Sequence, residues 1–140
     1  WQVLRAKLEM QLLLTGVPVL FCALCALVTL PGGAAEMALA VIAALLYTLL
    51  SALAALALGL KMPNLTWTNE ITPIKQGGSV MLALFANWFY AIALGGLYFL
   101  CGRYLSAAAY LALAAAVTAV VCALLLHWVK QRGTRIFAAL

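Results

Sequence analysis

Few residues in this sequence could do chemistry, and their spacing limits which chemistry they could do. Cys22 and Cys25 form a C-x-x-C pair, a spacing found in zinc and redox sites. The pair lies inside a long apolar run, without a neighbouring histidine or polar residue that could complete a metal site. We therefore interpret both residues, together with Cys101 and Cys122, as small buried hydrophobic residues and expect no metal ion and no disulfide.

The acidic residues and the single histidine are the next candidates. Proton-driven transport needs a carboxylate near the middle of a membrane, and hydrolysis inside a membrane needs a paired catalytic set. The only acids are Glu9, Glu36 and Glu70, each at the end of an apolar run or between two runs. His127 stands beside Trp128, which is typical of an anchor at the membrane surface. The sequence thus predicts no catalytic residues, no enzyme activity and no cofactor in this chain.

These side chains are carried by 140 residues, of which 69% are hydrophobic and 8% are charged. Soluble domains average about 25% charged residues, so this composition indicates an integral membrane protein. Four apolar runs, at approximately 10–30, 37–60, 79–100 and 105–129, are each long enough for the ~20 residues of a spanning helix. The sequence predicts an all-α, polytopic membrane protein with about four transmembrane helices, forming a single domain over residues 1–140.

The lysines and arginines indicate how the helices are oriented. All but one of the eight lie in the N-terminal flank, the loop 61–76 or the C-terminal tail, and only Arg103 lies on the opposite side. Cytoplasmic segments of membrane proteins carry an excess of basic residues. We therefore expect both termini and the loop 61–76 to be cytoplasmic. The net charge of +5 then reflects membrane orientation, and we expect no nucleic-acid partner.

Small and polar residues within the apolar runs predict how the helices pack. Ser51, Ala55 and Gly59 recur every fourth residue and form a stripe where another helix could approach closely. A second series of this kind consists of Ala108, Ala112 and Ala116. Asn87 is the most isolated polar residue within the third run, and we expect it to bond to a neighbouring helix. The alternative is that Asn87 lines a substrate path.

The loop 61–76 concentrates the polar residues of the chain. Trp67 and Ile71 are four residues apart and would share one face of a short amphipathic element. One interpretation is an interfacial element that places the tryptophan among lipid headgroups. The other is a docking surface for a cytosolic partner, with Trp67 and Ile71 as apolar contacts and Glu70 and Lys75 as charged contacts.

The segment Pro63–Glu70, with the sequence PNLTWTNE, and the following pair Lys75-Gln76 resemble a pattern in bacterial ABC-2-type permeases. These proteins are the membrane subunits of ATP-binding-cassette exporters. In large members, one span ends in a Pro-x-(Leu/Phe)-x-Trp-x-Asn-(Glu/Pro) loop, and a Lys-Gln pair opens the next span. The remainder of the chain is similar only in having spans that are rich in alanine and leucine.

The resemblance implies that the chain is part of a longer permease that moves a substrate across the bacterial inner membrane as a multi-pass protein. ATP would be hydrolysed by a separate ATP-binding-cassette ATPase subunit. The other partners would be the lipid bilayer and further transmembrane helices of the permease. The residues expected at the docking surface are Trp67, Asn69, Glu70, Ile71, Lys75 and Gln76. The alternatives are a non-catalytic four-helix accessory or assembly subunit and, with no acid at the midplane to favour it, a small secondary transporter.

Overall fold

A computed structural model describes residues 2–29, 32–61, 78–102, 104–133 and 135–136. The helices in this part of the chain are α1 (Gln2–Thr29), α2 (Ala34–Lys61), α4 (Gly78–Cys101) and α5 (Ala107–Trp128). A π-helical turn, η1 (Val129–Gly133), continues α5 without a break. The described residues include no β-strand, and all four long helices are apolar enough to cross a membrane. The prediction of an all-α protein with four spans is confirmed.

Among the helix boundaries that differ from the expected spans, those at the starts of α1 and α5 have local chemical reasons. α1 begins at Gln2 rather than near residue 10. Arg5 and Glu9 extend it beyond the apolar run, because they lie one helical turn apart and pair at 2.6 Å between Nε and Oε1. α5 begins slightly later than expected, because Ser106 caps it: its Oγ accepts a hydrogen bond from the backbone N–H of Ala109 at 3.3 Å.

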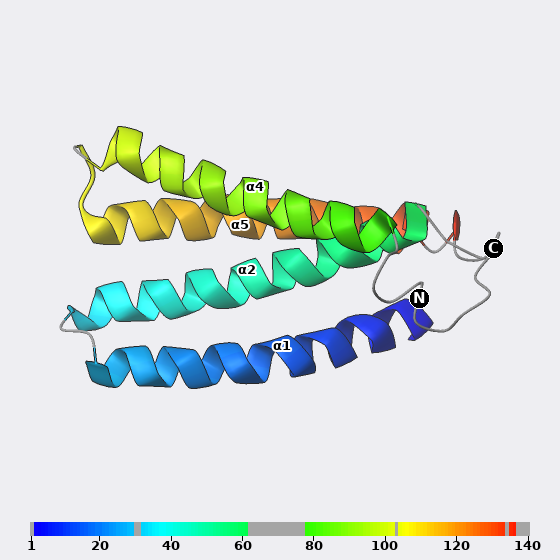
Figure 1. Cartoon of the computed structure of the whole chain (residues 1–140), viewed down its shortest axis with the longest axis horizontal. Helices are drawn as coiled ribbons and strands as arrows, with labels where there is room; N and C mark the ends of the chain where they lie inside the picture. Colours follow the sequence, from blue (N-terminus) through cyan, green and yellow to red (C-terminus); the bar gives the residue numbers. More distant parts are fainter. Residues whose placement is uncertain (1, 30–31, 62–77, 103, 134, 137–140) are drawn as a thin grey trace.

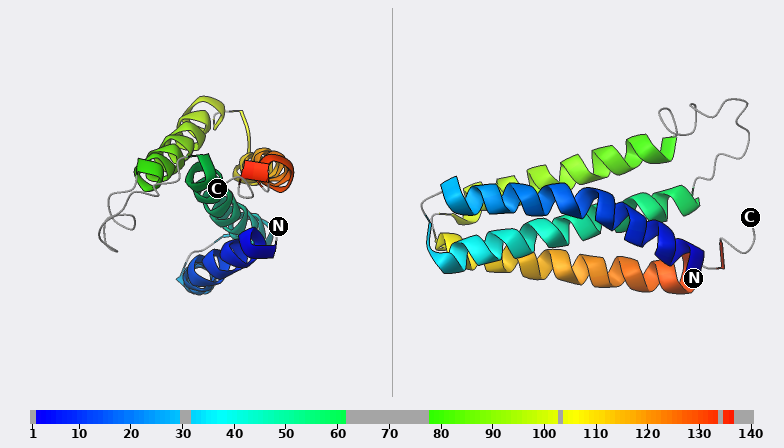
Figure 2. Two further views of the ribbon diagram at one scale, coloured as in Figure 1. Left: turned by 90° about the vertical axis from the view of Figure 1, so that its right-hand side faces the viewer. Right: turned by 90° about the horizontal axis from the view of Figure 1, so that it is seen from below.

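The helices are arranged around α2. Figure 1 shows α2 between α1 on one side and α4 and α5 on the other, with neighbouring helices in the chain running antiparallel. The end-on view in Figure 2 shows the other three helices placed around α2, and α2 contacts each of them. Its most extensive contact is with α5. Because α1 packs mainly on α2, much of the α1 surface has no protein neighbour among the described residues.

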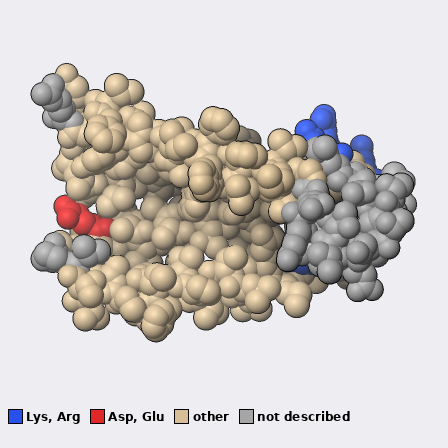
Figure 3. Space-filling view, in the orientation of Figure 1, with Lys and Arg blue, Asp and Glu red and all other residues tan. Residues whose placement is uncertain are grey.

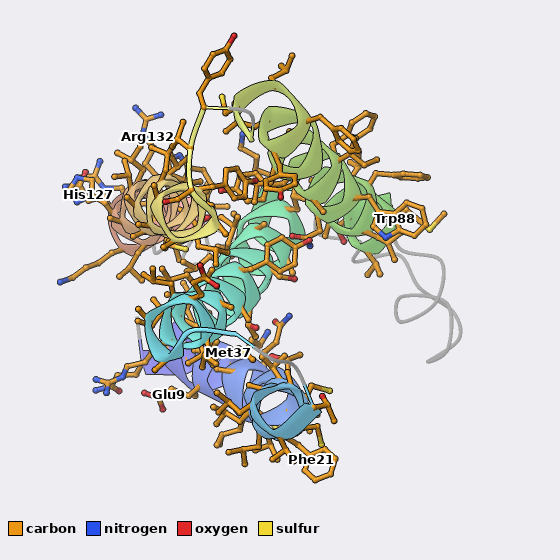
Figure 4. The ribbon with its side chains drawn as sticks, turned by 90° about the vertical axis from the view of Figure 1, so that its left-hand side faces the viewer. Glu9, Phe21, Met37, Trp88, His127 and Arg132 are labelled. Atoms are coloured by element: carbon orange, nitrogen blue, oxygen red, sulfur yellow. The ribbon has the colours of Figure 1, made fainter. Side chains whose placement is uncertain are left out.

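The buried core is thin and lies between α2 and α5. Leu50, Leu53 and Cys122 form its centre. None of the most apolar 18-residue stretch of α1 is buried. Phe21 on α1 and Trp88 on α4 are 67% and 64% exposed and point away from the bundle (Figure 4). Large apolar side chains therefore cover the outside of the bundle, where in a membrane they contact lipid.

Charged side chains are separated along the long axis of the bundle. The lysines and arginines that the structure describes are Arg5, Lys7, Lys61, Lys130, Arg132 and Arg135. All of them belong to the end of the bundle that holds the start of α1, the end of α2 and the end of α5 (Figures 1 and 3). We call this end the basic end. Glu36 lies in the first turn of α2, at the opposite end.

Candidate functional site

The expected docking surface falls on the segment that joins α2 to α4. Its six residues, Trp67, Asn69, Glu70, Ile71, Lys75 and Gln76, lie outside the described residues. The structure describes the two helix ends that carry this segment, Lys61 at the end of α2 and Gly78 at the start of α4. Both helix ends belong to the basic end of the bundle (Figure 1).

Polar side chains join α2 and α4 inside their apolar stretches. The Oη of Tyr47 donates a hydrogen bond to the backbone carbonyl of Asn87 at 3.0 Å. The Nδ2 of Asn87 in turn donates to the Oγ of Ser51 at 3.1 Å. Because Tyr47 and Ser51 are four residues apart, they lie on the same face of α2 and both reach Asn87. The interhelical hydrogen bond that we expected of Asn87 is therefore present.

Tyr90 extends these contacts from α4 to α5. Its ring stacks on that of Tyr47, with 6.1 Å between ring centroids and 22° between ring planes. Its Oη lies 2.8 Å from the Oγ1 of Thr118, which itself donates to the carbonyl of Ala114 at 2.7 Å. A threonine hydroxyl has one hydrogen, so Tyr90 must be the donor to Thr118. We call the five residues Tyr47, Ser51, Asn87, Tyr90 and Thr118 the polar cluster.

A second tyrosine links α5 to α4 nearer the turn that connects these helices. The Oη of Tyr110 donates to the backbone carbonyl of Leu94 at 2.6 Å. Its ring meets that of Tyr98 edge-on, at 5.0 Å between centroids and 67° between planes. A carbonyl oxygen has two lone pairs, so Leu94 can accept this bond and keep its bond within α4. Tyr90 and Tyr110 thus connect two helices that make few other contacts with each other.

The side chains of the polar cluster are suited to holding the helices in fixed positions relative to one another. Its hydroxyl and amide groups are neutral and engage one another across α2, α4 and α5. Such bonds between membrane helices are each worth about 0.6 kcal/mol on average. Among the described residues, no group of three or more histidine, cysteine or acidic side chains is placed to hold a metal ion.

The expectation that all four cysteines are buried holds fully for one of them. Cys22 and Cys25 are free and exposed on α1, Cys101 is half-buried, and only Cys122 is buried. The physical reason differs between the two exposed cysteines: Cys22 lines a pocket between α1 and α2, whereas Cys25 lies in an exposed part of the α1 surface. Cys122 is buried because it faces α2, where its Sγ lies 3.5 Å from the carbonyl oxygen of Leu46.

The residues expected in the α2 stripe have different environments. Ser51 belongs to the polar cluster, and Ala55 is half-buried. Gly59 is exposed, and a Cβ built there would have no neighbouring atom of the described residues within 4 Å. The face of α2 that is buried carries Leu50, Leu53, Ala57 and Leu60 instead. Of the three stripe residues, Ser51 therefore contacts α4, whereas Gly59 faces away from the other described helices.

The second alanine series is also placed differently from the expectation. Ala112 and Ala116 are exposed, and the buried residues of α5 are Ala114, Ala115, Thr118 and Cys122. In a helix with so many alanines, small residues four positions apart occur on several faces, so their spacing does not identify the contact face. Thr118 and Cys122 identify it better, since both are buried against neighbouring helices.

The tyrosines of the polar cluster were not expected from the sequence, although it holds a signal for them. Tyr47 and Ser51 are four residues apart in one span, and Asn87 and Tyr90 are three apart in another. Each pair places two polar groups on one helix face. Polar side chains on two spans avoid contact with lipid when they face each other. The two pairs together therefore indicate a contact between these spans.

The described part of the chain has four apolar helices with apolar side chains on the outside and charges at the helix ends. These features define a multi-pass helical membrane protein. No protein-family model matches the chain, and no curated protein sequence or solved structure is similar to it.

Proposed function

We propose that this chain is the membrane-spanning part of an ATP-binding-cassette exporter permease in the bacterial inner membrane. Its basic end, with both termini, faces the cytosol. The observation that carries this proposal is the charge distribution, because every described lysine and arginine belongs to the end where residues 62–77 connect α2 to α4. By the positive-inside rule, that end is cytosolic, and the connection is then accessible to a cytosolic ATPase.

The sequence of the connecting segment supports the choice of partner. Pro63–Glu70 and Lys75-Gln76 resemble the loop of ABC-2-type permeases, as described above. In this proposal the segment docks onto the ATPase subunit, and ATP hydrolysis there drives movement of the substrate. The four helices supply the membrane framework, and the polar cluster holds α2 at a fixed position relative to α4, the two helices that carry the segment.

The docking role is tested by a double substitution, Trp67→Ala with Glu70→Lys, in the complete permease reconstituted with its ATPase subunit in vesicles. We expect a lower rate of ATP hydrolysis with unchanged insertion of the permease, because an apolar contact is lost and a charge is reversed. The matched control is Thr66→Ala with Thr68→Ala, which should leave the rate unchanged. An undiminished rate in the Trp67/Glu70 variant would contradict the docking role.

A second candidate function is a non-catalytic accessory or assembly subunit. It is favoured by the large outward-facing apolar surface of α1, where Phe21 and Val28 are 67% and 87% exposed. A surface of this kind can pack on helices of another membrane protein as well as on lipid. In that case the protein would act through contacts made by its helices, and residues 62–77 would not be required for ATP hydrolysis.

A further inference from the structure

A groove lies between the C-terminal halves of α2 and α5, at the basic end of the bundle. Its volume is about 300 Å³, and it is lined by Ala54, Ala57, Leu58, Lys61, Leu125 and Trp128. Apart from the lysine, this lining is apolar or aromatic. We call this the Lys61 groove.

The Lys61 groove runs along the helices. Ala54, Leu58 and Lys61 follow one another at intervals of four and three residues, so they lie along one face of α2. At 1.5 Å per residue, these positions span about 10 Å. Leu125 and Trp128 line the facing side from α5. The groove is therefore elongated, with its apolar part in the spanning region and its lysine at the membrane surface.

The charged end of the groove is defined by Lys61 and Trp128. The Nζ of Lys61 lies 5.5 Å from the centroid of the Trp128 ring, within range of a cation–π contact, and the lysine remains exposed. The adjoining turn η1 is held against α2, because Gly133 is buried and a Cβ there would lie 3.0 Å from Leu60 Cδ1. Lys61 and Trp128 thus lie beside a turn that is packed against α2.

The charge around the groove favours an anion. Arg132 follows Trp128 by four residues and adds positive charge at the same end of the bundle. Glu9, the acid that the structure describes at this end, is paired with Arg5 at 2.6 Å. An elongated apolar groove that ends at an exposed lysine and a tryptophan matches a phospholipid, with its acyl chain in the groove and its phosphate at the lysine.

We propose that the Lys61 groove binds one anionic phospholipid. The acyl chain lies along Ala54, Leu58 and Leu125, and the phosphate contacts the ammonium group of Lys61. Trp128 borders the site at the level of the headgroups, where its ring holds the lysine in place. This site is additional to the proposed function and does not depend on it, because it requires only that the helices span a membrane.

The test uses the chain in lipid nanodiscs with Trp128 as the only tryptophan, after Trp1, Trp67 and Trp88 are each replaced by Phe. Phosphatidylglycerol with brominated acyl chains, which quench tryptophan fluorescence on contact, is titrated into phosphatidylcholine. A parallel titration uses brominated phosphatidylcholine. We expect half-maximal quenching of Trp128 at a lower mole fraction of phosphatidylglycerol. Equal mole fractions for the two lipids would overturn the proposal.

Variants at the lysine separate a specific site from general attraction to a basic surface. Lys61→Gln should raise the mole fraction of phosphatidylglycerol at half-maximal quenching about fivefold, the effect of one lysine near an anionic surface. Lys61→Arg should restore it. The matched control is Lys7→Gln, which removes one charge at the same end but away from the groove. If Lys7→Gln and Lys61→Gln have the same effect, the groove is not the binding site.

A third variant tests the apolar part of the groove. Ala54 is half-buried and lines the groove wall, so Ala54→Phe should fill the space that the acyl chain occupies. We expect this variant to lose the preference for phosphatidylglycerol while its helical circular dichroism spectrum stays unchanged. Retention of the full preference in a folded Ala54→Phe variant would show that the lipid lies elsewhere.

Discussion

Asn87 places a primary amide inside an apolar helix, where burying it without a partner costs about 1–3 kcal/mol. Two hydrogen bonds join this residue to α2, one from its side chain to Ser51 and one to its backbone carbonyl from Tyr47. Both partners lie on α2. Asn87 alone therefore determines which face of α2 packs against α4. At the residue scale, the polar cluster sets the register between these two helices.

A double-mutant cycle on Ser51→Ala and Asn87→Ala measures the side-chain bond. We expect a coupling free energy of about 0.6 kcal/mol and no more than about 1.7 kcal/mol, the range for hydrogen bonds between membrane helices. The measurement is the free energy of unfolding of the wild type, the two single variants and the double variant in detergent or bicelles. A cycle on Asn87→Ala and Thr29→Ala is the control, because among the described residues Thr29 donates a hydrogen bond to the carbonyl of Cys25 within α1. Strictly additive effects for Ser51 and Asn87 would contradict the contact.

The hydrogen bond of Asn87 could be predicted from the sequence, because an isolated amide in an apolar run needs a partner on another helix. The identity of that partner could not be predicted in the same way. Ser51 was expected to contribute as a small residue, whereas the structure uses its hydroxyl as an acceptor. Which residue becomes the partner of Asn87 depends on how α2 and α4 are rotated about their axes. Composition alone does not specify this rotation.

At the scale of the elements, α2 is the central helix and has two different surfaces. Leu53 is completely buried in the core with α5, whereas Gly59 is exposed. α2 packs against α1, α4 and α5, while α1 packs mainly on α2. A substitution on the exposed surface of α2 should therefore report on contacts outside the described bundle.

Gly59→Leu tests one surface through which an accessory subunit could bind its partner. Since a Cβ at Gly59 meets no atom of the described residues within 4 Å, a larger side chain should leave the packing of the described helices intact. If the chain is an accessory subunit that binds through this surface, Gly59→Leu should release its partner in mild detergent, as measured by size-exclusion chromatography of the purified complex. Gly95→Leu is the matched control on α4, where a Cβ is equally unobstructed. A complex that withstands Gly59→Leu would exclude this surface as the interface.

The number of helices was more predictable than their contact faces. Length and hydropathy suffice for four spans, because each needs only an apolar stretch that matches the membrane thickness. The contact faces depend on which side chains interlock. The expected series Ala108, Ala112 and Ala116 does not mark the α5 contact face, because alanine fits a surface that faces lipid as well as one that faces a helix. Residues that are costly to leave in lipid, such as Thr118, are the better guide.

At the scale of the whole molecule, the main feature is the separation of charge along the bundle. The described basic residues belong to the end with Gln2, Lys61 and η1, whereas Glu36 lies at the other end (Figure 3). An even number of spans brings the two described chain ends to the same end of the bundle (Figure 1). We propose, by the positive-inside rule, that this end is cytosolic, and the proposed contacts with an ATPase require this orientation.

Cysteine accessibility tests this orientation most directly. In a background with Cys22, Cys25, Cys101 and Cys122 replaced by Ala, single cysteines are introduced as Asn69→Cys, Gln131→Cys and Gly33→Cys. Gln131 and Gly33 are exposed at opposite ends of the bundle, and Asn69 belongs to the proposed docking surface. Each variant is treated with a membrane-impermeant maleimide in intact cells and after the inner membrane is permeabilised.

We predict that the cysteine at position 33 reacts in cells whose inner membrane is intact, provided that the reagent can pass the outer barrier. The cysteines at positions 69 and 131 should react only after the inner membrane is permeabilised. Reaction at position 69 or 131 from outside an intact inner membrane would contradict the proposed orientation and would remove the basis for an ATPase partner.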